Sequence, residues 1–471
     1  MPLLNNPTFA LQPAAERVAL STNYITNFNF LNQYLPDTYE KEFERYGNRT
    51  IASFLRLVGA EMPSNSDQIK WAEQGRLHIK YTQCTASAVA GGVGTFTIAD
   101  AGAATAAIRI GQTVFIQVNA TGVSNKAIVT AAAGLVITVA FYEATVNIVN
   151  TNVCTIFIYG SEFRKGTTGM VGSLEAEDVF FTNKPIILKD RYNISGSDMA
   201  QIGWVEVTTE NGATGYLWYL KSEHETRLRF EDYMETAMIE AVPAEAGSGA
   251  LVTAQVDGSE GIFFAVNNRG NVWGAGLPTT LADWDTIVQR LDRQGAIEEN
   301  VVFCNRDLSF AIDGMLAGLN GLSTAAPATP SFGASYGLFD NDATMALNLG
   351  FSGFRRGYDF YKSDWKYLND PTMRGGLSTA AATATGTVTG LLVPAGSTSV
   401  YDQIMGKNAK RPFLHVRYRA TETEDRRYKT WITGSAGGAQ TSDLDAMEVN
   451  FLSERCVCTL GANNFVLFRF G

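Results

Sequence analysis

Short strand-like runs dominate the hydrophobic pattern of the first half of the chain. Residues 77–81 and 155–159 alternate along the chain with β-branched and aromatic members, and residues 85–153 between them are rich in Ala, Gly, Thr, Val and Ile. Such runs, broken by Gly and Asn, are typical of antiparallel strands. The pattern predicts a hairpin over residues 75–190 with a small all-β module, residues 85–153, inserted at its tip. The charged residues of that module are Asp100, Arg109, Lys126 and Glu143.

A helical period follows in residues 216–241, which end before Pro243. The apolar stripe comprises Leu217, Leu220, Leu228, Met234 and Met238, and the polar face pairs Glu223 with Arg227 and Glu225 with Arg229. Each such pair adds only about 0.2–0.5 kcal/mol, so packing of the stripe must supply most of the stability. At about 26 residues the helix would be roughly 39 Å long.

Strand-like and helix-like patterns alternate from residue 249 onward. Thr280 with Asp283 predicts a capping-box start and Gly295 an end, while Asn305 is expected to cap a second amphipathic helix. Strands are predicted at 251–256, 261–266, 301–304, 413–418, 428–432, 448–452 and 456–468. Residues 1–36 indicate an extended arm, and two helical stretches follow it up to residue 58. Together these elements predict an α+β fold.

The composition is that of an ordinary globular protein, with a net charge of −10. General affinity for nucleic acid is not expected, because binding to the phosphate backbone needs a surplus of Lys and Arg. The first residues do not have the pattern of a secretory signal. Residues 127–142 are too short and residues 375–401 too polar for a transmembrane helix.

Five cysteines, an odd and sparse number, fit a reducing compartment better than a disulfide framework. Cys84 and Cys154 bracket the module and could face each other across the hairpin. Two half-buried thiols are the favoured interpretation.

The sequence offers no catalytic, cofactor or metal motif. His78, His224 and His415 have no histidine at i+3 or i+4, and neither a phosphate-binding Gly-rich loop nor a Gly-x-Ser-x-Gly elbow occurs. Residues 351–370 interleave aromatic side chains with Lys and Arg, a pattern that can bind single strands of nucleic acid. Three Asp nearly cancel that charge, so an aromatic, interface-forming sheet is favoured.

Charged residues near the C-terminus indicate contacts between copies of the chain. Arg417 and Arg419, two residues apart, should lie on one face of a strand, and an acidic and basic run follows. One copy's acids could then meet another's arginines, although a solvated turn with local pairing is an equal alternative. The candidates for subunit contact are Glu162, Arg164, Lys165, Arg411, Arg417, Arg419, Glu422, Glu424, Asp425, Arg426 and Arg427.

The order of these elements resembles the major capsid protein of tailed bacteriophages, which has the Hong Kong 97-like fold. Residues 411–418 and 453–458 look like the capsid proteins of crAss-like phages of Bacteroidales. The resemblance implies an N-terminal arm, an E-loop, a peripheral (P) domain with a spine helix and an axial (A) domain, with the all-β domain inserted in the E-loop. The implied divisions are 1–36 (arm), 37–74 (helical part of the P domain), 75–190 (E-loop), 191–248 (P domain), 249–404 (A domain) and 405–471 (returning strands).

The same resemblance implies a non-enzymatic subunit that assembles into pentamers and hexamers of a phage head enclosing double-stranded DNA. The head would form in the host cytoplasm, with a portal, a separate scaffolding protein and decoration proteins as partners, and without a cofactor or a membrane. An encapsulin-like shell around protein cargo is the first alternative, and a β-rich adhesin or tail protein the second.

Overall fold

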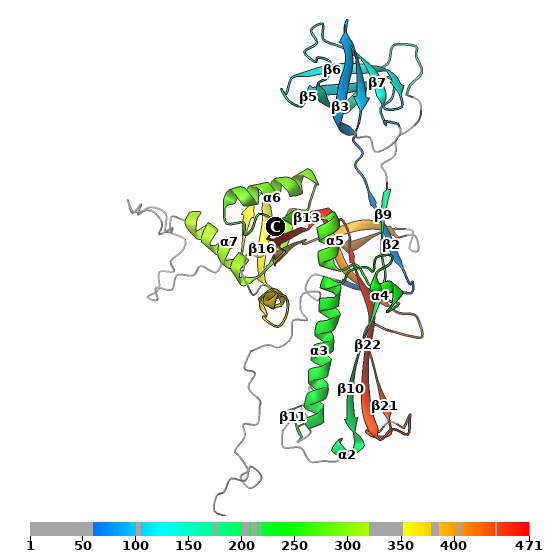
Figure 1. Cartoon of the computed structure of the whole chain (residues 1–471), viewed down its shortest axis with the longest axis vertical. Helices are drawn as coiled ribbons and strands as arrows, with labels where there is room; N and C mark the ends of the chain where they lie inside the picture. The colour runs from blue at the N-terminus through cyan, green and yellow to red at the C-terminus, as the bar shows by residue number, and fades with distance from the viewer. Residues whose placement is uncertain are drawn as a thin grey trace, which may run out of the picture. The chain divides into compact units, whose positions relative to one another are not determined.

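We describe the chain from a computed structural model (Figure 1). It describes residues 60–99, 105–170, 172, 178–199, 207–208, 214–215, 218–319, 352–377, 386–402, 407–438 and 440–470. The predicted arm, residues 1–36, and the helical stretches up to residue 58 lie outside these residues. Helices and strands are both present in the described part, as the α+β expectation requires.

Six strands close into a barrel, in the order β3-β4-β7-β6-β5-β8 (Figure 1, blue to cyan). They are β3 (Lys80–Ala90), β4 (Val93–Ile98), β5 (Gln112–Val118), β6 (Ser124–Ala133), β7 (Val136–Phe141) and β8 (Val153–Ser161). Gly91 and Gly92 turn the chain between β3 and β4 at φ values of 61° and 78°, which favour glycine. Closure leaves the barrel without the open sheet edges that invite aggregation.

The barrel has its own hydrophobic core. Phe96, Ile116 and Ile137 are fully buried inside it, and alternate residues along each strand point outward. The Phe96 and Phe141 rings meet edge to face, with centroids 6.4 Å apart. The segment with few charged residues therefore folds into a closed barrel.

The barrel is inserted between the strands of a hairpin, β2 (Ile69–Gln74) and β9 (Asp178–Asn183), which pair antiparallel from Ile69↔Asn183 to Gln74↔Asp178 (Figure 1). The sequence placed the hairpin arms at residues 77–81 and 155–159, and this is a correction. Lys80 pairs with Phe157 and Tyr81 with Ile156, as expected, but inside the barrel. The module is therefore larger than residues 85–153.

Helix α3 (Trp218–Glu240) confirms the predicted long helix. Phe230 on α3 packs against Tyr428 and Phe451, with ring centroids 5.7 and 5.8 Å apart. Met238 and Ile239 are fully buried in a core with Val416 and Val457. Packing of these side chains therefore stabilises the helix, because its surface ion pairs contribute little free energy.

The part of the chain outside the barrel is called the body. One of its sheets has the order β1-β20-β22-β10, with β21 also paired to β22. Its strands are β1 (Ala60–Ser64), β10 (Ile186–Ser195), β20 (Leu414–Arg419), β21 (Lys429–Gly434) and β22 (Ala446–Thr459). The sequence predicted separate strands at 448–452 and 456–468, which is wrong. Ser453 and Arg455 stay inside β22 because both donate to the carbonyl of Arg427, at 2.7 Å each.

A second sheet has the order β13-β23-β17-β14-β16-β15. Its strands are β13 (Asn271–Trp273), β14 (Glu299–Cys304), β15 (Gly353–Arg356), β16 (Tyr358–Asp364), β17 (Val388–Pro394) and β23 (Val466–Arg469). Helices α6 (Leu281–Arg293) and α7 (Arg306–Leu319) pack on it. Trp284 of α6 is the centre of this core, with the rings of Phe354 and Phe360 at 4.9 and 5.1 Å.

The predicted caps of these helices are confirmed. Thr280 and Asp283 form the reciprocal capping box of α6. Asn305 accepts a 2.8 Å hydrogen bond from the Leu308 N–H at the start of α7. Gly295 follows α6 in the left-handed region, at φ 68°.

Two predicted strands, 251–256 and 261–266, are wrong. Helices α4 (Gly249–Val252) and α5 (Ile262–Arg269) occupy these stretches. Ile262, Phe263, Ala265 and Val266 are buried, with the spacing of a helix face. A short apolar run has no clear period, so the sequence did not distinguish the two structures.

The remaining elements are short. They are α2 (Gly196–Met199), β11 (Val207–Thr208), β12 (Thr214–Gly215), α8 (Lys366–Asn369), η2 (Arg374–Gly376), β18 (Ser397–Asp402), β19 (Lys407–Pro412) and η3 (Ala462–Asn464). β11 pairs with β12, and β18 with β19. Among the described residues, no helix is both long and apolar enough to cross a membrane.

The chain divides into two compact units. The smaller includes Tyr192–Thr226 and Ile432–Val449, and the larger includes Thr50–Arg191, Arg227–Trp431 and Asn450–Gly471. In the smaller unit the Gly196 N–H donates to the Asp445 carbonyl at 3.1 Å, and the Thr433 hydroxyl donates to Glu448 at 3.2 Å. The barrel and the second sheet both belong to the larger unit.

The separate cores predict separate responses to mutation. Phe96→Ala should destabilise the barrel by about 3–5 kcal/mol, because it removes a fully buried ring. Hydrogen–deuterium exchange should then accelerate in β3–β8 and stay slow in β14. Phe360→Ala, in the core around Trp284, is the matched control and should show the reverse. Equal acceleration everywhere in both variants would show one cooperative core instead.

Candidate interaction surfaces

Strand β20 presents the predicted pair of arginines on one face. Arg417 lies opposite Met62 in the register and its guanidinium is 3.8 Å from the Met62 sulfur. Arg419 pairs with Asp67 and lies 3.5 Å from Glu454. The hydrogen bond with Asp67 raises the pKa of the Arg419 guanidinium. Arg411, the next candidate upstream, also contacts the Met62 sulfur, at 2.6 Å.

Glu454 is a buried carboxylate between two of the candidate arginines. Its side chain is 7% exposed, with Arg419 at 3.5 Å and Arg426 at 3.1 Å. Nearby, Arg427 pairs with Glu61, and Lys429 pairs with Glu424 at 2.5 Å. Ion pairs within the chain therefore neutralise much of the charge in this cluster. This agrees with the alternative of local pairing in a solvated turn. Asp425 accepts from the Arg427 N–H at 2.8 Å, and Glu422 is exposed.

The three candidates after β8 lie at the barrel. Glu162 accepts a 2.5 Å hydrogen bond from the Tyr142 hydroxyl, and burial together with this bond raises the pKa of Tyr142. Arg164 and Lys165 are exposed. Whether any of the eleven candidates contacts another copy stays a prediction.

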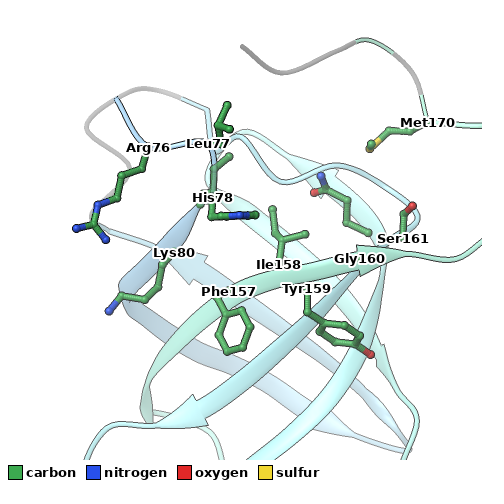
Figure 2. Close-up of a pocket in the computed structure, with 12 residues that line it drawn as sticks. Arg76, Leu77, His78, Lys80, Phe157, Ile158, Tyr159, Gly160, Ser161 and Met170 are labelled. Atoms are coloured by element: carbon green, nitrogen blue, oxygen red, sulfur yellow. The ribbon is translucent and has the colours of Figure 1, made fainter. Parts of the chain in front are cut away.

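A groove of about 1100 Å³ lies where β3 and β8 separate (Figure 2). Their pairing begins at Lys80↔Phe157, while residues 75–79 are outside any strand and β8 continues to Ser161. His78 points toward Ile158 in the close-up. The residues that line the groove are Arg76, Leu77, His78, Ile79, Lys80, Gln112, Phe157, Ile158, Tyr159, Gly160, Ser161 and Met170.

Exposed apolar side chains and cations share this groove. Leu77 is 71% exposed, Tyr159 49% and Met170 41%, so the residues that the structure describes leave its apolar wall open. Arg76, His78 and Lys80 also line it, and the lining contains no carboxylate. Uncovered apolar surface of this kind marks interaction sites.

The outer face of the barrel also carries aromatic side chains beside lysines. Register places Lys80, Phe157, Phe115 and Lys126 in one row across β3, β8, β5 and β6. Phe115 and Phe157 stack with centroids 5.2 Å apart, and the Lys126 ammonium lies 6.0 Å from the Tyr159 ring. Residues 80–170 contain five Lys and Arg against three Asp and Glu, whereas the whole chain has a net charge of −10. Residues 80–170 thus carry a small positive net charge within an acidic chain.

A second exposed apolar surface is the loop of residues 243–258. Its ends meet at an antiparallel bridge between Pro243 and Gly258, and the Ala244 N–H donates to the Asp257 carbonyl at 2.8 Å. A side chain on Gly258 would lie 2.4 Å from the Val242 carbonyl oxygen, so glycine permits this close approach. Val252 and Val256 are 66% and 52% exposed. The sequence pattern missed both this surface and the groove, because it predicts strands at residues 251–256 and 77–81.

The aromatic and basic segment 351–370 forms β15, β16 and α8. Three of its four cations are paired with Asp: Arg355 with Asp359 at 3.1 Å, Arg356 with Asp285 at 2.7 Å and Lys362 with Asp313 at 2.6 Å. Its largest rings are buried in the cores of the chain itself. The predicted sheet is present, and most of its rings pack inside the fold, whereas Tyr361 is 53% exposed.

All five cysteines are buried free thiols. Cys84 and Cys154 face each other in the β3–β8 register, and burial raises the pKa of Cys154 to about 11. They are fully buried, not half-buried as expected. A hydrogen bond from Cys456, with His415 and Arg417 nearby, lowers the pKa of Cys458. In the described part of the chain, no group of three or more His, Cys, Asp and Glu could hold a metal ion.

Solved structures from phages resemble the chain over most of its length, whereas no protein-family model and no curated protein matches the sequence. A chain of the mature capsid of bacteriophage PhiM1 is 8% identical with a TM-score of 0.39, and the match covers 92% of this chain and 91% of that one. A chain from the capsid of a native GTA particle is 9% identical, with a TM-score of 0.37 and coverage of 93% and 96%. A chain of Microbacterium phage Oxtober96 is 10% identical, with a TM-score of 0.38 and coverage of 92% and 96%. TM-scores this low carry no evidence about function, so the function has to be inferred from the residues of this chain.

Glu454→Gln should destabilise the subunit by about 2 kcal/mol, because it leaves Arg419 and Arg426 facing a neutral amide. Urea unfolding followed by circular dichroism measures this. Glu422→Gln is the matched control and should change the free energy of unfolding by no more than about 0.5 kcal/mol, since Glu422 is exposed. Equal stability of the two variants would show that the Glu454 cluster does not stabilise the subunit.

Proposed function

We propose that this chain is the major capsid protein of a tailed phage, a structural subunit that tiles an icosahedral head around double-stranded DNA. The observation that carries the proposal is the closed barrel inserted between β2 and β9. It has a core of its own, apart from the cores of the body, and it adds outward surface to the chain. Such a module suits contact with neighbours.

In this proposal the elements take the parts of a Hong Kong 97-like subunit. The β2–β9 hairpin with its barrel is the E-loop and its inserted domain, and α3 is the spine helix of the P domain. The sheet that contains β14 and β17, with α6 and α7, is the core of the A domain. The divisions inferred from the sequence and the narrower likeness to crAss-like phages belong to the same proposal.

Shell assembly follows from the physics of repeated contacts. Heterologous contacts close into rings, here pentamers and hexamers. Each contact has to be modest so that misplaced subunits can leave. A closed barrel offers contact surface without an open strand edge, which limits disordered aggregation between crowded copies. A net charge of −10 suits a wall along which packaged DNA slides without sticking.

Electron microscopy and native mass spectrometry of the chain purified from a bacterial cytoplasm test the proposal. Pentamers, hexamers or icosahedral shells are expected. A protein that stays monomeric at every concentration would contradict it. Particles that contain protein cargo and no DNA would instead indicate the encapsulin-like alternative, and fibres the tail-protein alternative.

Replacing residues 80–161 by a short Gly-rich turn should leave the body folded but weaken assembly, because the barrel has a separate core. Circular dichroism should retain the helix signal of α3, and native mass spectrometry should show fewer capsomers. As a matched control, shortening the exposed turn at Gly437 and Gly438 should leave assembly unchanged. Loss of the helix signal on barrel removal would show that the two parts fold together.

A further inference from the structure

The groove at the separation of β3 and β8 combines cations with exposed apolar side chains. The cations Arg76 and Lys80 line it, together with the exposed apolar side chains of Leu77, Tyr159 and Met170. An occupant that fits must bring aliphatic groups for the wall and a carboxylate for the cations. A purely polar or a basic segment would leave one of the two features unsatisfied.

The loop of residues 243–258 presents that chemistry. Leu251, Val252 and Val256 are 36%, 66% and 52% exposed, and they lie within six residues at the tip of the loop. The loop contains Glu245 and Asp257 and has neither Lys nor Arg. Asp257 is paired with Lys184 at 3.0 Å, whereas the Glu245 side chain is exposed and has no ion-pair partner among the described residues.

The loop is also built to keep this shape. The Pro243–Gly258 bridge closes its neck, and Ser248 caps α4 by accepting from the Leu251 N–H. Gln255 adopts φ 54°, a left-handed conformation that costs free energy for a residue other than glycine. A compact loop with fixed ends and an apolar tip is typical of a functional surface loop. Its tip therefore binds with little further ordering cost.

We propose that the 243–258 loop of one copy of this chain inserts into the β3–β8 groove of a neighbouring copy. Val252 and Val256 would cover the Leu77 and Tyr159 wall, and Glu245 would face Lys80. The groove and the loop are different patches of the same chain, so the contact is heterologous and repeats from copy to copy, which is the kind that generates rings. This inference rests on the proposed assembly function and names one of its contacts.

Cross-linking between two single-cysteine additions tests the contact. A tagged Val252→Cys chain and an untagged Leu77→Cys chain are mixed, allowed to assemble and oxidised with diamide. A disulfide-linked dimer that contains both chains is expected in the mixture and in neither variant alone. Leu377→Cys, which replaces a leucine that is 77% exposed, is the matched control and should not cross-link to Leu77→Cys. The native cysteines are buried, so they should not compete.

Exchanging the charges of Lys80 and Glu245 is an independent test of the contact. Lys80→Glu should raise the subunit concentration needed for half-maximal assembly about tenfold, because like charges then face each other. Adding Glu245→Lys to Lys80→Glu should restore most of the loss, whereas adding Glu422→Lys should not. The helix signal by circular dichroism is the check that each variant folds.

Two outcomes separate this inference from the assembly function. Capsomers that form without any Val252–Leu77 cross-link, or with no rescue by Glu245→Lys, would overturn the contact and leave the capsid proposal standing. A cross-link that forms within one chain of a Val252→Cys, Leu77→Cys double variant, in the monomeric fraction, would also overturn it. Absence of any oligomer of the unmodified chain would overturn the capsid proposal itself.

Discussion

Pairing of the long strand β22 is the constraint on which the body of the subunit depends. β22 is bonded to β20, β21 and β10 in one sheet, and it contributes Val457 to the core against which α3 packs. After the turn at Gly461 the chain enters β23, which lies between β13 and β17 in the other sheet. The C-terminal residues therefore hold both sheets, and these pairings join segments far apart in the sequence. Such non-local pairing forms slowly, and neither sheet is complete until β22 and β23 have been made.

The sequence predicted well where one local signal dominates. Helix α3 and the caps at Thr280 and Asn305 follow from a long period and from side chains that bond the backbone nearby. Short apolar runs did not determine their own structure, as α5 shows, because eight residues carry too little periodicity. The break expected near Ser453 was wrong because partners distant in sequence satisfy its polar side chains.

Candidate surfaces were harder to predict than elements. Charge alone pointed to β20 and its turn, yet Glu454 and Glu61 compensate several of those arginines within the chain. Exposure of apolar side chains depends on which neighbours cover them, and the sequence does not give those neighbours. Leu77 and Val252 illustrate this, since each reads as an ordinary strand residue and is instead among the more exposed aliphatic side chains.

The opening and closing strands of the barrel are hydrogen-bonded neighbours, with Lys80 opposite Phe157. An insertion whose two ends emerge side by side requires its host to supply only a narrow two-stranded stem. A domain with this property can be acquired, lost or exchanged as a cassette while the host scaffold keeps its own register. In the shell proposed above, the stem between β2 and β9 is consequently a natural graft point for foreign domains whose termini lie equally close together.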